Sequence, residues 1–180
     1  MVSVRLVAVS GSPGVGKSAL CRLLGESGFN DVDLTALVKK EGLGVRDRKR
    51  DALAVDVDVL EGALKEKIRG SSGVVVLDGL LSHHLPVERV VVVRCDALVL
   101  AGRLKARKYS SEKIRENVEA EFLGVILEEA LGKKVPVLEV DVTKEIDFKR
   151  VAGWVKNKGE TNLLSLDMSE SFSVFLGGFI

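Results

Sequence analysis

The residues with the clearest chemical meaning are eight consecutive positions near the start of the chain: Gly11-Ser12-Pro13-Gly14-Val15-Gly16-Lys17-Ser18. A glycine, four residues and then Gly-Lys-Ser is the spacing of a phosphate-binding loop. Glycines let successive backbone N–H groups turn inward toward phosphate oxygens. Lys17 can reach the outer phosphates, and the Ser18 hydroxyl can bind Mg²⁺. The run therefore predicts a nucleoside triphosphate site.

The flanks of this loop agree with that prediction. Residues 5–9 form a short, mostly apolar run that is typical of a buried strand, and residues 19–24 have the pattern of a helix. The N-terminus of such a helix adds a partial positive charge. We expect the backbone N–H groups from Gly14 to Ala19 to hold the β-phosphate. The alternative, a chance glycine-rich turn, does not account for both flanks.

A second apolar run, residues 74–78, ends in Asp78. An acid at the end of a strand beside a phosphate loop can hold Mg²⁺, directly or through water. The competing interpretation is an aspartate that caps the next turn, and the presence of the loop favours the magnesium role. His83 and His84 follow closely, but no cysteine or carboxylate spacing makes them a zinc site.

Strand-like and helix-like segments alternate along the chain. The strand-like segments are β-branched and short, and they span residues 4–10, 29–34, 74–78, 89–94 and 135–141. The helical patterns lie at 17–27, 57–69, 97–105, 111–131 and 145–157. This alternation predicts an α/β fold with a parallel sheet and helices on both faces. A chain of 180 residues is long enough for one domain with a sizeable core.

Composition excludes several classes of function. The formal net charge is +1, so general nucleic-acid binding is not expected. Charged residues interrupt every apolar run, so no membrane span is expected. The N-terminus enters a strand directly, without an evident signal peptide. Cys21 and Cys95 have no metal-site spacing and are expected to be buried thiols of a cytoplasmic protein.

Two basic segments leave alternatives open. Residues 35–56 contain six basic residues, and the general explanation of such a run is a solvated helix and loop: Lys39, Lys40, Arg46, Arg48, Lys49 and Arg50. Arg103 and Arg107 are four residues apart and share one helix face. They suit a phosphate chain, or equally ion pairs with glutamates of a neighbouring helix.

The last twenty residues, 161–180, follow the final helical pattern and contain half of the chain's six phenylalanines. One interpretation is a partly ordered extension that packs on the body of the protein. The other is a segment that docks a partner, because exposed aromatic groups tend to mark contacts.

With these motifs, the chain resembles the archaeal and nuclear type of adenylate kinase, a small family also linked to ribosome assembly. Four segments carry the resemblance: the loop 11–18, Leu77-Asp78-Gly79-Leu80-Leu81-Ser82-His83, Val93-Arg94-Cys95-Asp96, and the block 103–121. The last block is the most specific, because it is similar to the family's short lid and the helix after it. The match covers about residues 4–157.

The resemblance implies a three-layer P-loop fold of the nucleoside monophosphate kinase kind, with a five-stranded parallel sheet. Residues 1–160 would form the kinase domain, with an AMP-binding insertion at 35–56, a short lid at 106–116, and a C-terminal extension at 161–180. Arg107 matches the family's nucleotide-contacting arginine, and Lys144 falls near the ATP base. Asp78 corresponds to the magnesium-holding acid. Lys39, Arg46, Arg48 and His83 are the candidates for binding AMP.

The sequence departs from the family at Leu80, where relatives usually have the first histidine of an Asp-Gly-His-x-x-His segment; His83 is the second. The resemblance links that first histidine to ATP hydrolysis and release of the family's partner, and Leu80 lacks the imidazole for this role. Lys108 also stands where relatives often have glycine, which predicts a slightly different lid turn.

The resulting prediction is a Mg²⁺-dependent kinase that converts ATP and AMP into two ADP, with Lys17, Asp78, Arg103 and Arg107 at the reacting phosphates. The resemblance also suggests a role in maturation of small-subunit rRNA. The main alternative is an ATP-switched assembly factor that binds ribosomal protein uS11 of the small ribosomal subunit. A third is a small-metabolite kinase, such as a dephospho-coenzyme A or shikimate kinase, against which the lid block argues.

Overall fold

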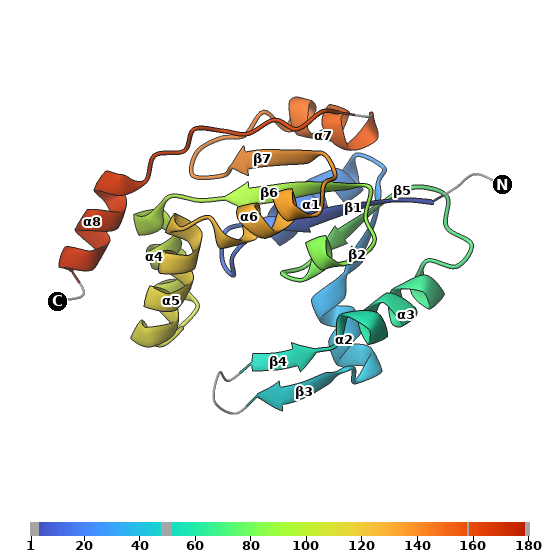
Figure 1. Cartoon of the computed structure of the whole chain (residues 1–180), viewed down its shortest axis with the longest axis horizontal. Coiled ribbons are helices and arrows are strands. Elements are labelled where there is room, and N and C mark those ends of the chain that lie inside the picture. The colour runs from blue at the N-terminus through green and yellow to red at the C-terminus, as the bar shows by residue number, and fades with distance from the viewer. Residues whose placement is uncertain (1–3, 48–51, 158, 179–180) are drawn as a thin grey trace.

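The computed structural model describes residues 4–47, 52–157 and 159–178. Its centre is a five-stranded parallel sheet (Figure 1). The strands lie in the order β2 (Asn30–Asp33), β5 (Gly73–Asp78), β1 (Val4–Ser10), β6 (Arg89–Arg94) and β7 (Val137–Asp141). The predicted parallel α/β fold is therefore confirmed.

Helices cover both faces of this sheet and bury two separate apolar clusters. One face carries α1 (Lys17–Glu26), α4 (Ala97–Ala106), α5 (Ser111–Phe122), α7 (Phe148–Lys156) and α8 (Ser169–Gly177). The other face carries α2 (Leu34–Glu41), α3 (Val57–Lys67) and α6 (Val125–Gly132). Among the described residues, no helix is both long and apolar enough to cross a membrane.

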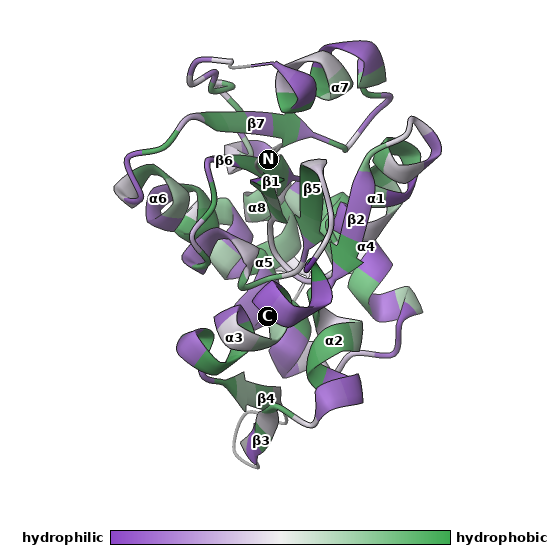
Figure 2. Ribbon diagram, turned by 90° about the vertical axis from the view of Figure 1, so that its right-hand side faces the viewer, coloured by the Kyte–Doolittle hydropathy of each residue, from purple (hydrophilic) through white to green (hydrophobic). Residues whose placement is uncertain are grey.

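The central strands are apolar on both sides, which is why they lie in the middle layer (Figure 2). In β6, Val91 and Val93 point into one cluster, whereas Val90 and Val92 point into the other. All four are fully buried, and each such valine contributes about 1.5 kcal/mol or more through removal from water. Alternation along each strand thus anchors both helical layers to a single sheet.

The helix expected over 111–131 is interrupted, and this prediction was wrong. The structure ends α5 at Phe122 and starts α6 at Val125. Gly124 adopts a φ of 67°, a left-handed conformation that an α-helix cannot contain. The Arg94 guanidinium donates to the carbonyl oxygen of Glu121 at 2.8 Å, which satisfies part of the exposed end of α5.

The insertion at 35–56 is more structured than the expected helix and loop. After α2, strands β3 (Gly44–Asp47) and β4 (Ala52–Val55) pair antiparallel as a hairpin. Figures 1 and 2 show this hairpin projecting from the body beside α2 and α3. Val45 is 76% exposed, so the hairpin has little buried apolar surface of its own.

The C-terminal segment packs on the body of the protein. Asn162 exchanges backbone hydrogen bonds with β7, donating to Val137 at 2.8 Å and accepting from Glu139 at 3.0 Å. Farther on, the ring of Phe172 stacks on Phe122 with centroids 3.9 Å apart, and Phe175 is buried. These contacts favour the packing interpretation of the tail; Phe179 lies outside the described residues.

We predict that Phe175→Ala lowers the free energy of unfolding by about 3 kcal/mol, because truncation of a buried phenylalanine leaves a cavity. Thermal and chemical unfolding of the full chain would measure this effect. Val174→Ala is the matched control, since Val174 lies beside it on α8 and is 58% exposed. Equal, small losses for both variants would contradict a packed tail.

Candidate functional site

The candidate site lies at the carboxyl edge of the sheet, where the chain order of the strands reverses. Strands β5 and β6 flank β1 on opposite sides, and the phosphate loop leaves the end of β1. Asp78 ends β5 and pairs in register with Val9. Ligands of open parallel sheets bind in the crevice at such a switch point, so the fold brings the loop and the acid to the expected place.

Two glycines of the loop are required by its close packing. Gly11 has a φ of 147°, and a Cβ there would lie 2.4 Å from the carbonyl oxygen of Val93. Gly14 has a φ of 88°, and a Cβ there would lie 2.8 Å from the Leu104 side chain. At Gly11 a larger residue would push the loop away from β6, and at both positions the positive φ disfavours any residue that has a Cβ. The conformation of the loop therefore depends on contacts with the surrounding helices and strands as well as on its own sequence.

The loop delivers its backbone N–H groups to the start of α1. Gly16 is the N-cap of α1 and has no side chain that could accept from the first turn. The first turn of α1 therefore keeps donors that an anionic ligand can use. Ser18, in that turn, is exposed, whereas the N–H of Ala19 donates to the carbonyl oxygen of Gly16 at 3.1 Å. This arrangement suits a phosphate group.

The ammonium of Lys17 folds back over the loop. Its Nζ donates to the carbonyl oxygens of Gly11 at 2.7 Å and Ser12 at 3.0 Å. Burial lowers the pKa of Lys17 to about 8, although the negative charges of Asp78 and Glu121 oppose the shift. A phosphate chain at the loop would supply the negative charge that this buried cation lacks.

Asp78 and Ser18 supply adjacent oxygens of the kind that Mg²⁺ prefers. Asp78 is only 7% exposed. Burial raises the pKa of its carboxyl, while a hydrogen bond from Ser18 and the charge of Lys17 act in the opposite direction. A cation beside this buried carboxylate would stabilise its ionised form. The donor set therefore fits a magnesium ion that accompanies a nucleotide.

A pocket of about 670 Å³ opens beside the loop on the side of α1 and α4. It brings together seven of the sequence candidates from three segments: Gly14, Val15, Gly16, Ala19, Arg103, Arg107 and Lys144. Apolar side chains, among them Leu23, Val142 and Phe148, complete its wall. Arg107 and Lys144 are exposed cations at this pocket, which Glu145 also lines, and the combination of apolar wall and cations suits a base and an attached phosphate chain.

Arg103 supports the loop through hydrogen bonds with the protein itself. Its guanidinium donates to the carbonyl oxygens of Val15 and Val142 and to the sulfur of Cys95. Within the part of the chain that the structure describes, it pairs with these groups and not with a glutamate of a neighbouring helix, the alternative that the sequence left open. In this conformation Arg103 holds the loop to the strand ends, whereas Arg107 lies farther out.

The turn between α4 and α5 contains Lys108 in a left-handed conformation, with a φ of 60°. Glycine adopts this conformation without strain. The Lys108 backbone therefore adopts a conformation that is open to glycine as well. Ser110 caps α5 by accepting a hydrogen bond from the backbone N–H of Lys113. The turn therefore ends where α5 begins.

A buried ion network stands behind the loop, and its partners were not apparent from the sequence. Arg94 donates to Glu121 at 2.7 Å and to Glu139 at 2.8 Å, and all three side chains are almost fully buried. The Ser12 hydroxyl donates to Glu121 at 2.6 Å. An arginine that ends an apolar strand is a signal that a buried partner exists, but spacing cannot identify glutamates 27 and 45 residues away.

The AMP candidates do not gather at one place. Lys39 lies exposed on α2, and Arg46 lies exposed on β3. Arg48 lies outside the described residues. His83 is 1% exposed, and its ring nitrogens contact Ser10 at 2.8 Å and Glu129 at 2.9 Å. In this conformation His83 therefore has no exposed ring atom for a substrate.

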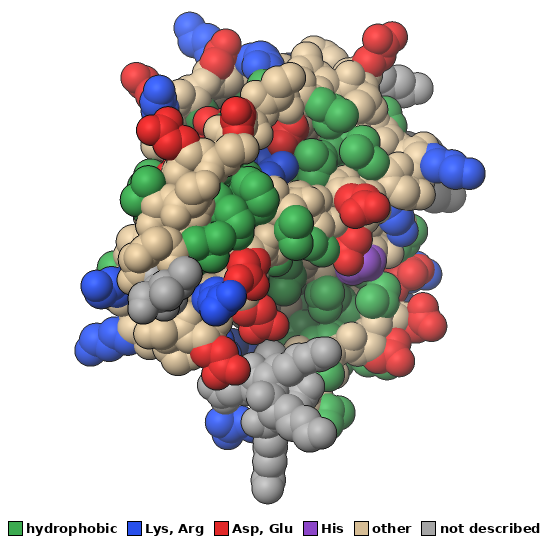
Figure 3. Space-filling model, turned by 60° about the vertical axis from the view of Figure 1, so that its left-hand side comes forward, with side chains coloured by type: hydrophobic (Ala, Val, Ile, Leu, Met, Phe, Trp, Pro, Cys, Tyr) green, Lys and Arg blue, Asp and Glu red, His purple; other side chains and the backbone are tan. Residues whose placement is uncertain are grey.

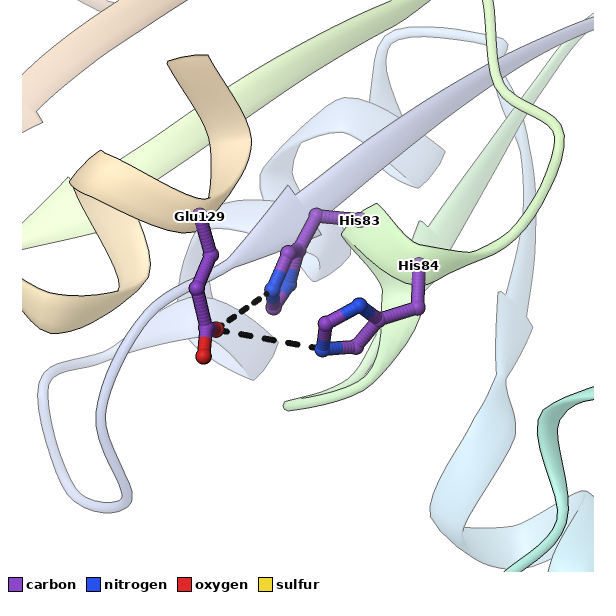
Figure 4. Close-up of side chains that lie close together, drawn as sticks. All are labelled: His83, His84 and Glu129. Carbon is purple, nitrogen blue, oxygen red and sulfur yellow. Dashed lines mark hydrogen bonds and ion pairs between the residues drawn. The ribbon is translucent and has the colours of Figure 1, made fainter. Parts of the chain in front are cut away.

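The two histidines have a carboxylate neighbour that the sequence spacing did not reveal. Glu129 of α6 approaches both His83 and His84 (Figure 4). Burial lowers the pKa of His83, although its hydrogen bond with Glu129 acts in the opposite direction. The sequence spacing offered no carboxylate for these histidines, and the fold supplies one from α6, which contacts the segment that follows β5.

Known proteins match this arrangement. A family model described as an AAA domain matches residues 7–124. A Thermococcus onnurineus protein named "Putative adenylate kinase" is 44% identical over 139 residues, which cover 77% of this chain and 75% of that protein. A Pyrococcus abyssi protein of the same name is 37% identical over 172 residues, 93% of each chain.

Solved structures support the fold. The crystal structure of a "putative kinase" from Chloroflexus aurantiacus has a TM-score of 0.52 and 20% identity, and the match covers 86% of this chain and 95% of that one. At this identity the likeness concerns the fold alone, whereas the archaeal relatives share sequence over most of their length. The chain therefore belongs to the AAA-domain P-loop kinases and, among them, to the family of archaeal proteins named putative adenylate kinase.

Proposed function

We propose that the protein is a Mg²⁺-dependent adenylate kinase that transfers the γ-phosphoryl group of ATP to AMP. The observation that carries the proposal is the meeting of Lys17, Ser18 and Asp78 beside the pocket that Arg107 and Lys144 line. The names of the archaeal relatives support AMP as the acceptor. The nucleotide would lie with its phosphates on the loop and its base in the apolar pocket.

The reaction needs positioning and charge neutralisation more than covalent help from the protein. An oxygen of the AMP phosphate attacks the γ-phosphorus of ATP, and the bond to the β–γ bridging oxygen breaks, which leaves two ADP. No general base is needed, because the attacking phosphate is already an anion. Lys17 would follow the migrating group, and the loop N–H groups would hold the β-phosphate that leaves.

Ser18 and Asp78 would hold Mg²⁺, which supplies positive charge to the β- and γ-phosphate oxygens when it is bound. The buried setting of Asp78 strengthens its interaction with a cation. Arg107, on the turn after α4, would close over the phosphates from the opposite side. Closure of residues 106–116 would exclude water, the competing acceptor.

The projecting segment at 35–56 would bind AMP. It combines α2 with the β3–β4 hairpin, and Lys39 and Arg46 are exposed cations on it. A coupled assay of ADP formation with AMP, dAMP, CMP, GMP and UMP tests this acceptor. Preference for AMP is the expected result; turnover of none of these acceptors would overturn the proposal.

An exposed apolar surface favours a second candidate, an ATP-switched assembly factor that binds a protein such as uS11. Leu123 is 70% exposed and Leu131 is 40% exposed beside a groove of about 610 Å³, and Figure 3 shows hydrophobic side chains gathered on this side of the molecule. Such surfaces tend to mark protein contacts. ADP formation from ATP that is equally fast with and without AMP would favour this candidate over the kinase.

We predict that Lys17→Ala leaves the protein folded and lowers AMP-dependent ADP formation by about 10³-fold, because it removes a transition-state charge contact. Arg22→Ala is the control, since Arg22 lies on the same helix with its side chain 74% exposed. Circular dichroism would verify folding of both. Near-normal turnover by folded Lys17→Ala would remove Lys17 from the mechanism.

Arg107→Ala is expected to weaken ATP binding about tenfold and to leave AMP binding unchanged, because Arg107 lines the pocket beside the loop. Lys108→Gly removes the neighbouring charge while keeping the left-handed turn, and we expect it to bind ATP normally. Calorimetric titration would compare the three proteins. Loss of thermal stability with intact ATP affinity would instead make Arg107 a structural residue.

We expect ATP hydrolysis without AMP to be slow, because Leu80 cannot orient a water molecule. The Leu80 side chain is 43% exposed, so a histidine has space there. Leu80→His should raise phosphate release more than AMP-dependent transfer, since only hydrolysis needs a positioned water. Side-by-side measurement of phosphate and ADP checks this, and robust hydrolysis by the unmodified chain would contradict it.

A further inference from the structure

Three metal-ligating side chains converge on the side of the sheet that α6 covers. His83 and His84 come from the short 3₁₀ helix η1 (Ser82–His84), and Glu129 comes from α6 (Figure 4). The Glu129 Oε2 atom lies 2.9 Å from Nε2 of His83 and 3.8 Å from Nε2 of His84. One ligand atom from each residue lies within 4.8 Å of the other two.

The hydrogen bonds around His83 leave a place for a cation. The hydroxyl of Ser10 donates to the carbonyl oxygen of Leu80 at 3.0 Å. With its one proton used there, Ser10 accepts from Nδ1–H of His83 at 2.8 Å. Nε2 of His83 lies 2.9 Å from Oε2 of Glu129, which is a hydrogen-bond distance. A metal ion that displaced the proton between these two atoms would bind both of them.

The ligand set and its support match the chemistry of zinc. We propose that His83, His84 and Glu129 form a binding site for Zn²⁺ or a similar transition-metal ion. Ligands of a tetrahedral zinc ion lie about 3.3 Å apart, and the distances from Glu129 Oε2 to the two histidines, 2.9 and 3.8 Å, lie on either side of that value. The bond from Nδ1 of His83 to Ser10 is the kind of supporting contact that orients a metal-bound histidine. Water would complete the coordination.

The site is open to an ion on one side only. His83 is 1% exposed, whereas the side chains of His84 and Glu129 are 38% and 46% exposed. Figure 3 shows a histidine side chain beside acidic groups at the surface. Lys133 lies nearby, and its Nζ donates to the carbonyl oxygen of His84 at 3.1 Å. A bound ion would tie α6 to the segment after Asp78.

This site differs in chemistry from the nucleotide site. Imidazole nitrogens favour zinc, copper, nickel or iron, whereas the hydroxyl and carboxylate of Ser18 and Asp78 favour magnesium. Cys21 and Cys95 are buried free thiols and stay outside the cluster. The proposal stands independently of the kinase reaction, because metal binding needs neither ATP nor AMP.

The proposal is tested by isothermal titration calorimetry. Zn²⁺ is added to the metal-stripped, nucleotide-free full chain in the presence of excess Mg²⁺. Co²⁺ provides a second probe, because its visible absorption reports tetrahedral nitrogen and oxygen coordination. We expect one ion per chain, and about 100-fold or greater loss of affinity in His84→Ala and in Glu129→Gln. Glu128→Gln is the matched control on the exposed side of the same helix.

Thermal unfolding provides an independent reading. Zn²⁺ should raise the melting temperature of the unmodified chain and of Glu128→Gln, but not that of His84→Ala or Glu129→Gln. Both ligand variants alter exposed side chains, and their metal-free melting curves verify that they fold. Absence of Zn²⁺ binding by the unmodified chain, or equal affinity in all four proteins, would overturn the proposal. His83 would then have a structural role through its hydrogen bonds.

Discussion

The guanidinium of Arg94 is the contact on which the phosphate loop and its surroundings depend. It lies between the buried carboxylates of Glu121 and Glu139, and an unpaired charge at that depth would be strongly unfavourable. The second carboxylate oxygen of each glutamate accepts a further hydrogen bond. Ser12 of the loop donates to Glu121, and the backbone N–H of Leu164 donates to Glu139. One ion network thus joins the loop, α5, β7 and the tail.

This network holds the elements around the nucleotide site in place. It does not fully compensate the charges of Lys17 and Asp78 within the site. Burial disfavours both the ammonium of Lys17 and the carboxylate of Asp78, as their shifted pKa values indicate. Arg103 fixes the loop from the other side through the Val15 carbonyl. The protein therefore holds opposite charges in place before any phosphate arrives, which is the preorganisation that phosphoryl transfer uses.

Features that depend on a local residue pattern could be predicted from the sequence. The phosphate loop, Asp78 and the five parallel strands follow from glycine spacing and apolar runs, which are properties of neighbouring residues. The break at Gly124, the β3–β4 hairpin and the partners of Arg94 could not be predicted in this way. They arise when segments distant in the chain meet, as when Glu129 reaches His83 from 46 residues away.

The pairing of Asn162 with β7 has a consequence for how the molecule behaves in a crowded solution. β7 is the last strand of the sheet, and an uncovered edge strand is a template for pairing with other chains. The tail occupies part of that edge through hydrogen bonds with Val137 and Glu139. The segment around Asn162 therefore leaves less of this edge free to pair with a neighbouring molecule.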